Sequence, residues 1–154
     1  MTETPKVFSF TTKYEGGISR RLLNDVLVVY GAKSVPVKAL WDTGASGTCI
    51  SYDVAQRLSM TPTGKQNIST PSGLSVVNTY LVDIILPNHV AVRQIPVCDS
   101  EIGKQGIGVL IGMDIITHGD FAVSNYNGKT TFSFRIPSCQ VTDYVAEADD
   151  NIKT

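Results

Sequence analysis

The sequence predicts an all-β protein with one or two short helices. Three observations support this fold class: most apolar residues lie in short runs rich in valine and isoleucine, these runs are separated by glycine, proline and asparagine turns, and only two brief segments have helical spacing. Side chains branched at Cβ pack well on a pleated sheet, and such turn residues reverse the chain between strands. We therefore expect successive hairpins.

Length and composition favour one globular domain. A chain of 154 residues can bury roughly 70% of its unfolded surface in one core. The net charge of -1 gives no electrostatic reason to expect a nucleic acid or an anionic membrane as a partner. No run approaches the ~20 continuous apolar residues of a membrane helix, and residues 1–6 lack the basic-then-apolar order of a secretory signal. These features predict a cytoplasmic protein with neither nucleic-acid nor membrane partners.

The first predicted hairpin places an acidic residue at the end of a strand. Val26 to Tyr30 forms a β-branched run, Gly31 to Ser34 interrupts it, and Val35 to Trp41 resumes it. This order is typical of two antiparallel strands joined by a turn. Asp42 directly follows the C-terminal end of the second strand, and we expect the sheet to hold its carboxylate in place.

The middle of the chain predicts two more hairpins. A strand from Gly64 to Ile68 is followed by turn residues at 70–73, and a longer strand runs from Leu74 to Leu86. A proline followed two residues later by a glycine is turn chemistry, which makes 70–73 a hairpin tip. The segment 87–89 then turns the chain into a strand from Val90 to Val97.

Two short segments predict helices. Ser51 is a plausible N-cap for a helix that runs to Leu58, and Pro62 prevents its continuation. Residues 113–117 can form one or two helical turns, capped by Gly119.

A short apolar strand and a hairpin follow towards the C-terminus. Val109 to Ile111 is wholly apolar and precedes Gly112. Asn127-Gly128 lies between the strand-like segments 121–126 and 129–136, which indicates a type I′ turn.

The tripeptide Asp42-Thr43-Gly44 is the main candidate for a catalytic site. It follows an apolar strand and occurs only once in the chain, so a second carboxylate would have to come from elsewhere. A carboxyl group beside a tight glycine loop can have a perturbed pKa if it is buried or paired with another carboxylate. Taken alone, Asp, Thr and Gly also favour an ordinary turn.

Two motifs together resemble the retropepsin-like aspartic proteases. The first is Leu40-Trp41-Asp42-Thr43-Gly44-Ala45-Ser46, and the second, about seventy residues later, is Val109-Leu110-Ile111-Gly112-Met113-Asp114 with the apolar residues that follow. The resemblance covers roughly residues 22–136 and implies a closed-barrel-like acid protease fold. It divides the chain into an N-terminal extension or strand at 1–21, a protease domain at 22–136 and an acidic, disordered tail at 137–154.

The resemblance also implies a role for each residue that matches the motifs. Asp42 would be the general acid and base, Thr43 would bond to the partner's loop, and Gly44 would permit the tight loop geometry. The remaining implied site residues form three groups: Ala45 for substrate binding, Ser72, Gly73 and Leu74 near the tip of a flap that closes over the peptide, and Ile111 and Gly112 as support for the active-site loop.

The implied function is an aspartic endopeptidase acting on extended peptides. Because each chain carries one such carboxylate, the resemblance implies a homodimer in which two Asp42 residues meet at a two-fold axis. Two alternatives stay open: a catalytically idle peptide-binding or scaffold module with the same fold, and an enzyme that mainly processes its own precursor. The substrate would be a peptide or protein, and no cofactor is expected.

Some residues depart from the retroviral pattern or belong to no motif. Retroviral members commonly have an acidic residue at the position of Ser46 and an arginine at that of Met113, and both are absent here. Asp114 is expected to form local hydrogen bonds at the start of its helix. The three cysteines are irregularly spaced, which favours reduced, mostly buried thiols over a disulfide framework. The two histidines are isolated, so no metal site is expected.

Overall fold

A hairpin of two long strands begins the barrel that contains the predicted site. The computed structural model describes residues 4–152. Strands β2 (Leu23–Tyr30) and β3 (Lys33–Trp41) pair antiparallel along their whole length. The turn between them is only Gly31-Ala32, because Lys33 and Ser34, which the sequence placed in the turn, already pair with β2. Gly31 has a φ of 58°, a conformation that glycine adopts without steric cost.

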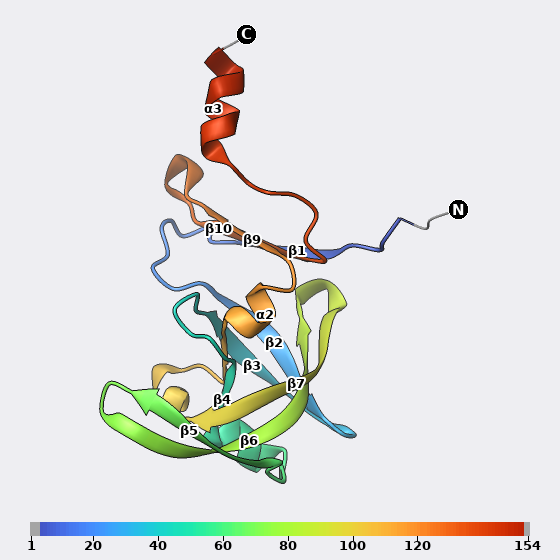
Figure 1. Ribbon diagram of the computed structural model, residues 1–154, viewed down its shortest axis with the longest axis vertical. Coiled ribbons are helices and arrows are strands. Elements are labelled where there is room, and N and C mark those ends of the chain that lie inside the picture. Colours follow the sequence, from blue (N-terminus) through green and yellow to red (C-terminus); the bar gives the residue numbers. More distant parts are fainter. Residues whose placement is uncertain (1–3, 153–154) are drawn as a thin grey trace.

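Six strands close into a barrel, as the resemblance implied. Their order is β2-β3-β8-β4-β7-β6, and β6 pairs back onto β2 to complete the circuit (Figure 1). Strand β5 adds to the outer side of β6. The barrel interior is filled by fully buried aliphatic side chains such as Val28, Ile84 and Val109. The bounds of the other strands are β4 (Cys49–Ser51), β5 (Gly64–Thr70), β6 (Gly73–Leu86), β7 (Val90–Ser100) and β8 (Val109–Ile111).

The two hairpins predicted in the middle of the chain are present. Thr70 pairs with Gly73 at the tip of the β5–β6 hairpin, which leaves Pro71-Ser72 as the turn. A short 3₁₀ segment, η1 (Pro87–His89), joins β6 to β7. The hairpin of β5 and β6 extends away from the barrel wall as a long curved arm (Figure 1).

The first predicted helix is confirmed, with small differences at its end. Helix α1 (Tyr52–Arg57) begins after Ser51, whose hydroxyl oxygen accepts a hydrogen bond from the N–H of Val54 at 3.2 Å. Leu58 is its C-cap.

The second predicted helix ends differently from the expectation. Helix α2 (Met113–Ile116) has Thr117 as its C-cap, not Gly119. Gly119 is instead required by close packing, because a Cβ atom built there would lie 1.7 Å from the carbonyl oxygen of Arg135. A second 3₁₀ segment, η2 (Glu101–Gln105), precedes β8.

A separate three-stranded sheet brings both ends of the chain together. Strand β10 (Thr131–Ile136) pairs antiparallel with β1 (Phe8–Lys13) on one side and with β9 (Asp120–Ser124) on the other. The predicted turn at Asn127-Gly128 is confirmed: both residues have positive φ, and the N–H of Lys129 bonds to the carbonyl of Tyr126, as in a type I′ turn. The 3₁₀ segment η3 (Tyr126–Gly128) marks this turn.

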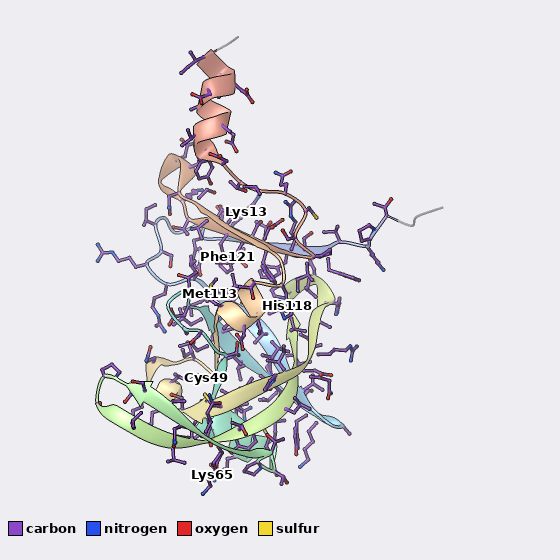
Figure 2. All side chains as sticks on the ribbon, in the orientation of Figure 1. Lys13, Cys49, Lys65, Met113, His118 and Phe121 are labelled. Atoms are coloured by element: carbon purple, nitrogen blue, oxygen red, sulfur yellow. The ribbon has the colours of Figure 1, made fainter. Side chains whose placement is uncertain are left out.

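Aromatic packing ties this sheet to the barrel. Trp41, the last residue of β3, stacks on Phe121 with ring centroids 5.3 Å apart, and Phe134 lies 5.0 Å away on another side. The Trp41 indole N–H donates to the side-chain oxygen of Asn24, and the residue is buried. Figure 2 shows Phe121 in the sheet and Met113 of α2 beneath it. The strand that leads to Asp42 is therefore anchored immediately before the site.

The C-terminal segment differs from the sequence prediction. Instead of a disordered tail, residues Tyr144–Ile152 form helix α3, which extends away from the three-stranded sheet (Figure 1). The helix has no buried residue, so its formation rests on local hydrogen bonds such as that of Val145 N–H to the Asp143 carboxylate. The outermost parts of both predicted terminal segments, residues 1–3 and 153–154, lie outside the described residues.

Candidate active site

Backbone pairing fixes Asp42 at the end of β3. Trp41 is in register with Ile111 in the parallel pairing of β3 and β8, and the N–H of Asp42 donates to the carbonyl of Ile111 at 2.9 Å. The Asp42 carboxylate turns back onto its own loop, where Oδ1 accepts the N–H of Gly44 at 2.8 Å. Asp42 is half-buried. The structure thus holds the carboxylate at a defined place while leaving part of it open to solvent.

The loop after Asp42 packs directly on Gly112. The N–H of Met113 donates to the carbonyl of Ala45 at 2.8 Å. A Cβ atom at position 112 would lie 2.5 Å from the carbonyl oxygen of Gly47 and 2.9 Å from that of Ala45. Real Cβ contacts are essentially never so short, so only glycine fits here. Ile111 and Gly112 therefore hold this loop in place through backbone contacts.

A buried threonine and an aspartate form a second connection between these segments. Asp114 accepts hydrogen bonds from both the N–H and the hydroxyl of Thr48, at 2.9 and 2.7 Å. The Thr48 oxygen in turn accepts the N–H of Gly112, and Asp114 also accepts the N–H of Ile115 within its own helix. Asp114 was expected to form local hydrogen bonds, and the bond from Ile115 is one of them. Its main partner is 66 positions away in sequence, and no motif signal pointed to Thr48.

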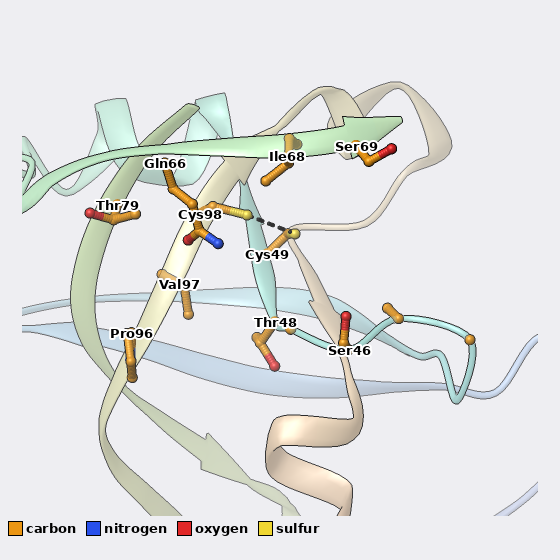
Figure 3. A pocket seen from close by; sticks show the side chains of 13 residues that line it. Ser46, Thr48, Cys49, Gln66, Ile68, Ser69, Thr79, Pro96, Val97 and Cys98 are labelled. Carbon is orange, nitrogen blue, oxygen red and sulfur yellow. Dashed lines mark hydrogen bonds between the residues drawn. The ribbon is translucent and has the colours of Figure 1, made fainter. Parts of the chain in front are cut away.

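A cavity lies between this loop and the β5–β6 hairpin. Its volume is about 370 Å³, and it is partly open to solvent, with side chains from several strands around it (Figure 3). The lining residues come from the loop and β4 (residues 44–49), from β5 (Gln66, Ile68 and Ser69) and from β6 and β7 (Thr79, Pro96, Val97 and Cys98). Asp42 is not itself among the described lining residues, which begin two positions later at Gly44. A cleft of this size can hold part of an extended peptide.

The structure brings some of the predicted site residues together and separates others. Asp42, Gly44, Ala45, Ile111 and Gly112 meet around one loop through the contacts given above. Thr43, between Asp42 and Gly44, is exposed.

The predicted flap residues lie at a hairpin tip, as expected, but apart from the Asp42 loop. Ser72, Gly73 and Leu74 lie at the exposed tip of the β5–β6 hairpin, and none of them is among the described residues that line this cavity. The hairpin faces the cavity with residues of β5, which the sequence did not distinguish from other strand residues.

Residues 4–152 contain neither a candidate metal centre nor a helix that could span a membrane. Within that range no group of three or more His, Cys, Asp or Glu side chains is placed to hold a metal ion. Within the same range no helix has the length and apolar character needed to cross a membrane.

Comparison with known families agrees with this geometry. A sequence model of the family described as "gag-polyprotein putative aspartyl protease" matches residues 31–118, which is more than half of the chain. The matched range contains both Asp42-Thr43-Gly44 and Ile111-Gly112. The chain belongs to this aspartyl protease family. A comparison with curated protein sequences gave no match.

Solved structures place this family member among the retropepsin-like folds. The retropepsin-like aspartic protease from Rickettsia conorii superposes with a TM-score of 0.56 at 16% identity, over 85% of this chain and 94% of that one. The EIAV protease, solved with the inhibitor HBY-793, superposes with a TM-score of 0.50 at 19% identity, over 68% of this chain and 91% of that one. At these identities the likeness concerns the fold, and it confirms the predicted retropepsin-like architecture.

Proposed function

We propose that this protein is an aspartic endopeptidase that hydrolyses extended polypeptides as a homodimer. The observation that carries the proposal is the position of Asp42, which ends an apolar strand in a loop held by Ile111 and Gly112 beside the cleft. Membership of the aspartyl protease family supports the same reaction. In this proposal Asp42 is the catalytic residue, Thr43 and Gly44 shape its loop, and Ala45 contacts the substrate backbone.

The chemistry requires two carboxyl groups that share a proton. Two carboxyls about 3 Å apart cannot both ionise, so one stays protonated at a pH where the other is charged. The charged carboxylate takes a proton from water while the neutral carboxyl donates a hydrogen bond to the scissile carbonyl oxygen. Water adds to the carbonyl carbon, the carbon–nitrogen bond then breaks, and the leaving nitrogen takes up a proton. No covalent intermediate with the protein forms.

The second carboxyl group comes from a second copy of the chain in this proposal. The motif occurs once per chain, and a two-fold axis through the loops would bring two Asp42 residues together. Thr43 is exposed, so its hydroxyl is available to a partner's loop.

The β5–β6 hairpin is proposed to close over the bound peptide. Its tip is solvent-exposed, and Leu74 has 82% of its surface accessible. An exposed apolar side chain at the end of a mobile arm can cover a peptide and exclude water when the arm closes. Ser72 and Gly73 would pair with the extended peptide backbone as an added strand.

The decisive experiment compares the wild type with Asp42→Asn on a peptide library, with products identified by mass spectrometry. We expect cleavage by the wild type and none by Asp42→Asn, because an amide cannot take the proton from water. Asp25→Asn is the matched control: Asp25 is exposed and paired only with Lys38 on the barrel surface, so its cleavage pattern should equal that of the wild type.

The same experiment separates the alternatives. If neither wild type nor Asp42→Asn cleaves any peptide but both bind peptides equally, the protein is an idle binding module. If the wild type leaves the library intact but its own mass shortens with time, while that of Asp42→Asn stays constant, the protein mainly processes itself.

A further inference from the structure

Two cysteines from distant parts of the sequence meet in the wall of the cleft. Cys49 in β4 and Cys98 in β7 are register partners in the parallel pairing of these strands. Their sulfur atoms are 3.1 Å apart, and both are free thiols. Figure 3 shows the two side chains pointing towards each other beneath β5. Their irregular spacing had favoured reduced thiols over a disulfide framework, and it is the pairing of β4 with β7 that brings the two together.

The pair is accessible to small molecules. Both cysteines are half-buried, and both line the 370 Å³ cavity. The third cysteine, Cys139, is exposed near the three-stranded sheet, which corrects the expectation that the thiols are mostly buried. Because Cys139 follows β10 and is absent from the cavity lining, it serves as an internal reference.

We propose that Cys49 and Cys98 form an oxidisable dithiol, which hydrogen peroxide converts reversibly into a disulfide in the cleft wall and which makes peptide binding sensitive to redox state. The formation of the disulfide is independent of any catalytic activity. Its effect on peptide binding rests on the proposed function.

The reaction balances with peroxide as the only oxidant. The Cys98 thiolate attacks one peroxide oxygen, the oxygen–oxygen bond breaks, and the released hydroxide takes up a proton to become water. The sulfenic acid on Cys98 is then attacked by the sulfur of Cys49, which loses its proton as a second hydroxide leaves and becomes water. Two thiols and one peroxide give one disulfide and two waters. A dithiol reductant such as dithiothreitol returns both thiols.

Local electrostatics favour Cys98 as the attacking sulfur. The hydrogen bond with Cys49 lowers the pKa of Cys98 to about 7, against about 8.5 for an ordinary thiol. The same contact raises the pKa of Cys49, so Cys49 is the proton donor of the pair. The nearby carboxylates of Asp99 and Asp114 raise the pKa of both thiols, but they do not offset the hydrogen bond at Cys98.

The strand geometry also allows the bond. Neighbouring strands lie about 4.8 Å apart, and disulfides join residues whose Cα atoms are about 4.4–6.8 Å apart. The sulfur atoms have to approach from 3.1 Å to about 2.05 Å. Small side-chain rotations can supply this approach without displacing β4 from β7.

Oxidation would change the cleft at a point where a peptide side chain is expected to lie. The two sulfurs lie between Thr48 and the residues of β5 that form the opposite wall (Figure 3). A disulfide removes both thiol hydrogens and links the two strands, so this wall can no longer adjust to a side chain. The Asp42 loop is not altered, and we therefore expect a change in KM with little change in kcat.

The test uses the full chain carrying Cys139→Ser, so that only the pair can react. Reduced protein is treated with hydrogen peroxide, and intact and peptide mass spectrometry follow the loss of two hydrogen atoms. We expect one disulfide that links the peptides containing Cys49 and Cys98. With Cys98→Ser added, no oxidation should occur at low peroxide. With Cys49→Ser added, the reaction should stop at a sulfenic acid that dimedone traps on Cys98.

The pH dependence of peroxide consumption and the KM of peptide cleavage provide two further measurements. Peroxide consumption by the pair should rise with pH, reach half of its maximum near pH 7, and level off about one to two pH units higher. For a peptide that the reduced protein cleaves, oxidation should raise KM several-fold, and dithiothreitol should reverse the rise. Counting free thiols in the wild-type chain before and after oxidation requires no substitution and guards against a variant that fails to fold.

Two results would overturn the proposal. The first can be obtained whether or not the protein is an active protease, whereas the second requires an active protease. If peroxide modifies only Cys139 in the wild type, or leaves both thiols of the pair free, the dithiol chemistry is wrong even when proteolysis is active. If the disulfide forms but KM is the same before and after oxidation, the redox control of the cleft is wrong. A protein that forms the disulfide but cleaves nothing contradicts the proposed function alone.

Discussion

Gly112 is the residue on which the site loop most directly depends. Replacing it with alanine would place a Cβ atom 2.5 Å from the carbonyl oxygen of Gly47, and neither backbone can move without breaking the bond between Met113 and Ala45. We expect Gly112→Ala to lower the free energy of unfolding by about 1–3 kcal/mol and to reduce activity further by displacing the loop. Urea unfolding monitored by tryptophan fluorescence measures the first effect.

The control for this prediction is Gly16→Ala. A Cβ atom at Gly16 meets nothing within 4 Å, and its φ is not in the left-handed region. Its free energy of unfolding should stay within about 0.5 kcal/mol of the wild type. Equal stability of the two variants would show that the loop moves freely away from position 112.

Thr48 provides a second test at the scale of one side chain. Thr48→Val keeps the shape but removes the hydroxyl that donates to Asp114 and accepts from Gly112. Thr48 is buried, so water does not replace the hydrogen bonds that the Asp114 carboxylate and the Gly112 N–H lose. We expect a loss of about 1–3 kcal/mol in the free energy of unfolding.

Thr63→Val is the matched control for Thr48. The Thr63 hydroxyl bonds to that of Thr79, but this contact is exposed, so water replaces it and the free energy of unfolding should change little. A loss at Thr63 as large as that at Thr48 would mean that burial is not the cause.

The candidate site was predictable at some residues and not at others. The positions of Asp42, Gly44, Ile111 and Gly112 could be predicted because they depend on local sequence: a strand end, a tight turn and a position without room for a side chain. Thr48, Asp114 and the cysteine pair act through contacts across 49 to 66 positions. No local pattern encodes such contacts, because strand order decides them.

At the scale of elements, hydrogen bonds to Asp120 connect the segment after β10 to the start of β9. Its carboxylate accepts the N–H of Cys139 at 2.8 Å and the Nε–H of Arg135 at 2.7 Å, and it also accepts the hydroxyl of Ser138. The backbone N–H of Cys139, then Ser138 and Arg135, hold the pKa of Asp120 well below its usual range. These bonds connect β9, β10 and the segment that leads to α3.

The lowered pKa makes this connection sensitive to acid. A carboxyl whose folded-state pKa is lowered contributes stability above its unfolded pKa of about 3.9 and loses it as the pH falls towards the folded value. We expect Asp120→Asn to be less stable than the wild type at pH 7 and to lose less stability between pH 5 and pH 3. Urea unfolding at a series of pH values and fixed protein concentration measures both.

Asp25→Asn is again the control, because its surface ion pair with Lys38 is exposed and such pairs contribute little. It should follow the wild-type pH dependence. If Asp120→Asn also follows it, the carboxylate of Asp120 does not hold the C-terminal segment in solution.

The elements themselves were mostly predictable, because hairpins are local. The turns at Gly31, at Pro71-Ser72 and at Asn127-Gly128 lie where turn chemistry placed them. The pairing of β1 with β10 was not predictable, since it joins residues more than 100 positions apart. Helix α3 was missed because its acidic composition resembles that of disordered tails, and no buried face marks it as a helix.

At the scale of the whole molecule, the described chain presents one Asp42 loop with Thr43 exposed beside it. The three-stranded sheet pairs β1 with β10 of the same chain, so both of these strands already have a partner within the protomer. A dimer in which the two loops meet would therefore be held by the loops and by surfaces around them. The proposed activity then depends on association as much as on the fold.

Mixing active and inactive chains tests this dependence. Equal amounts of wild type and Asp42→Asn, incubated until subunits exchange, should form dimers of which about a quarter contain two Asp42 residues. Adding the variant doubles the number of dimers, but only about a quarter of them are active. Activity should therefore fall to about half of that measured for the same amount of wild type alone. Adding Asp25→Asn instead should raise activity, since its loop is intact. Unchanged activity on adding Asp42→Asn would mean that each chain cleaves peptides by itself, and the paired-carboxylate mechanism would have to be abandoned.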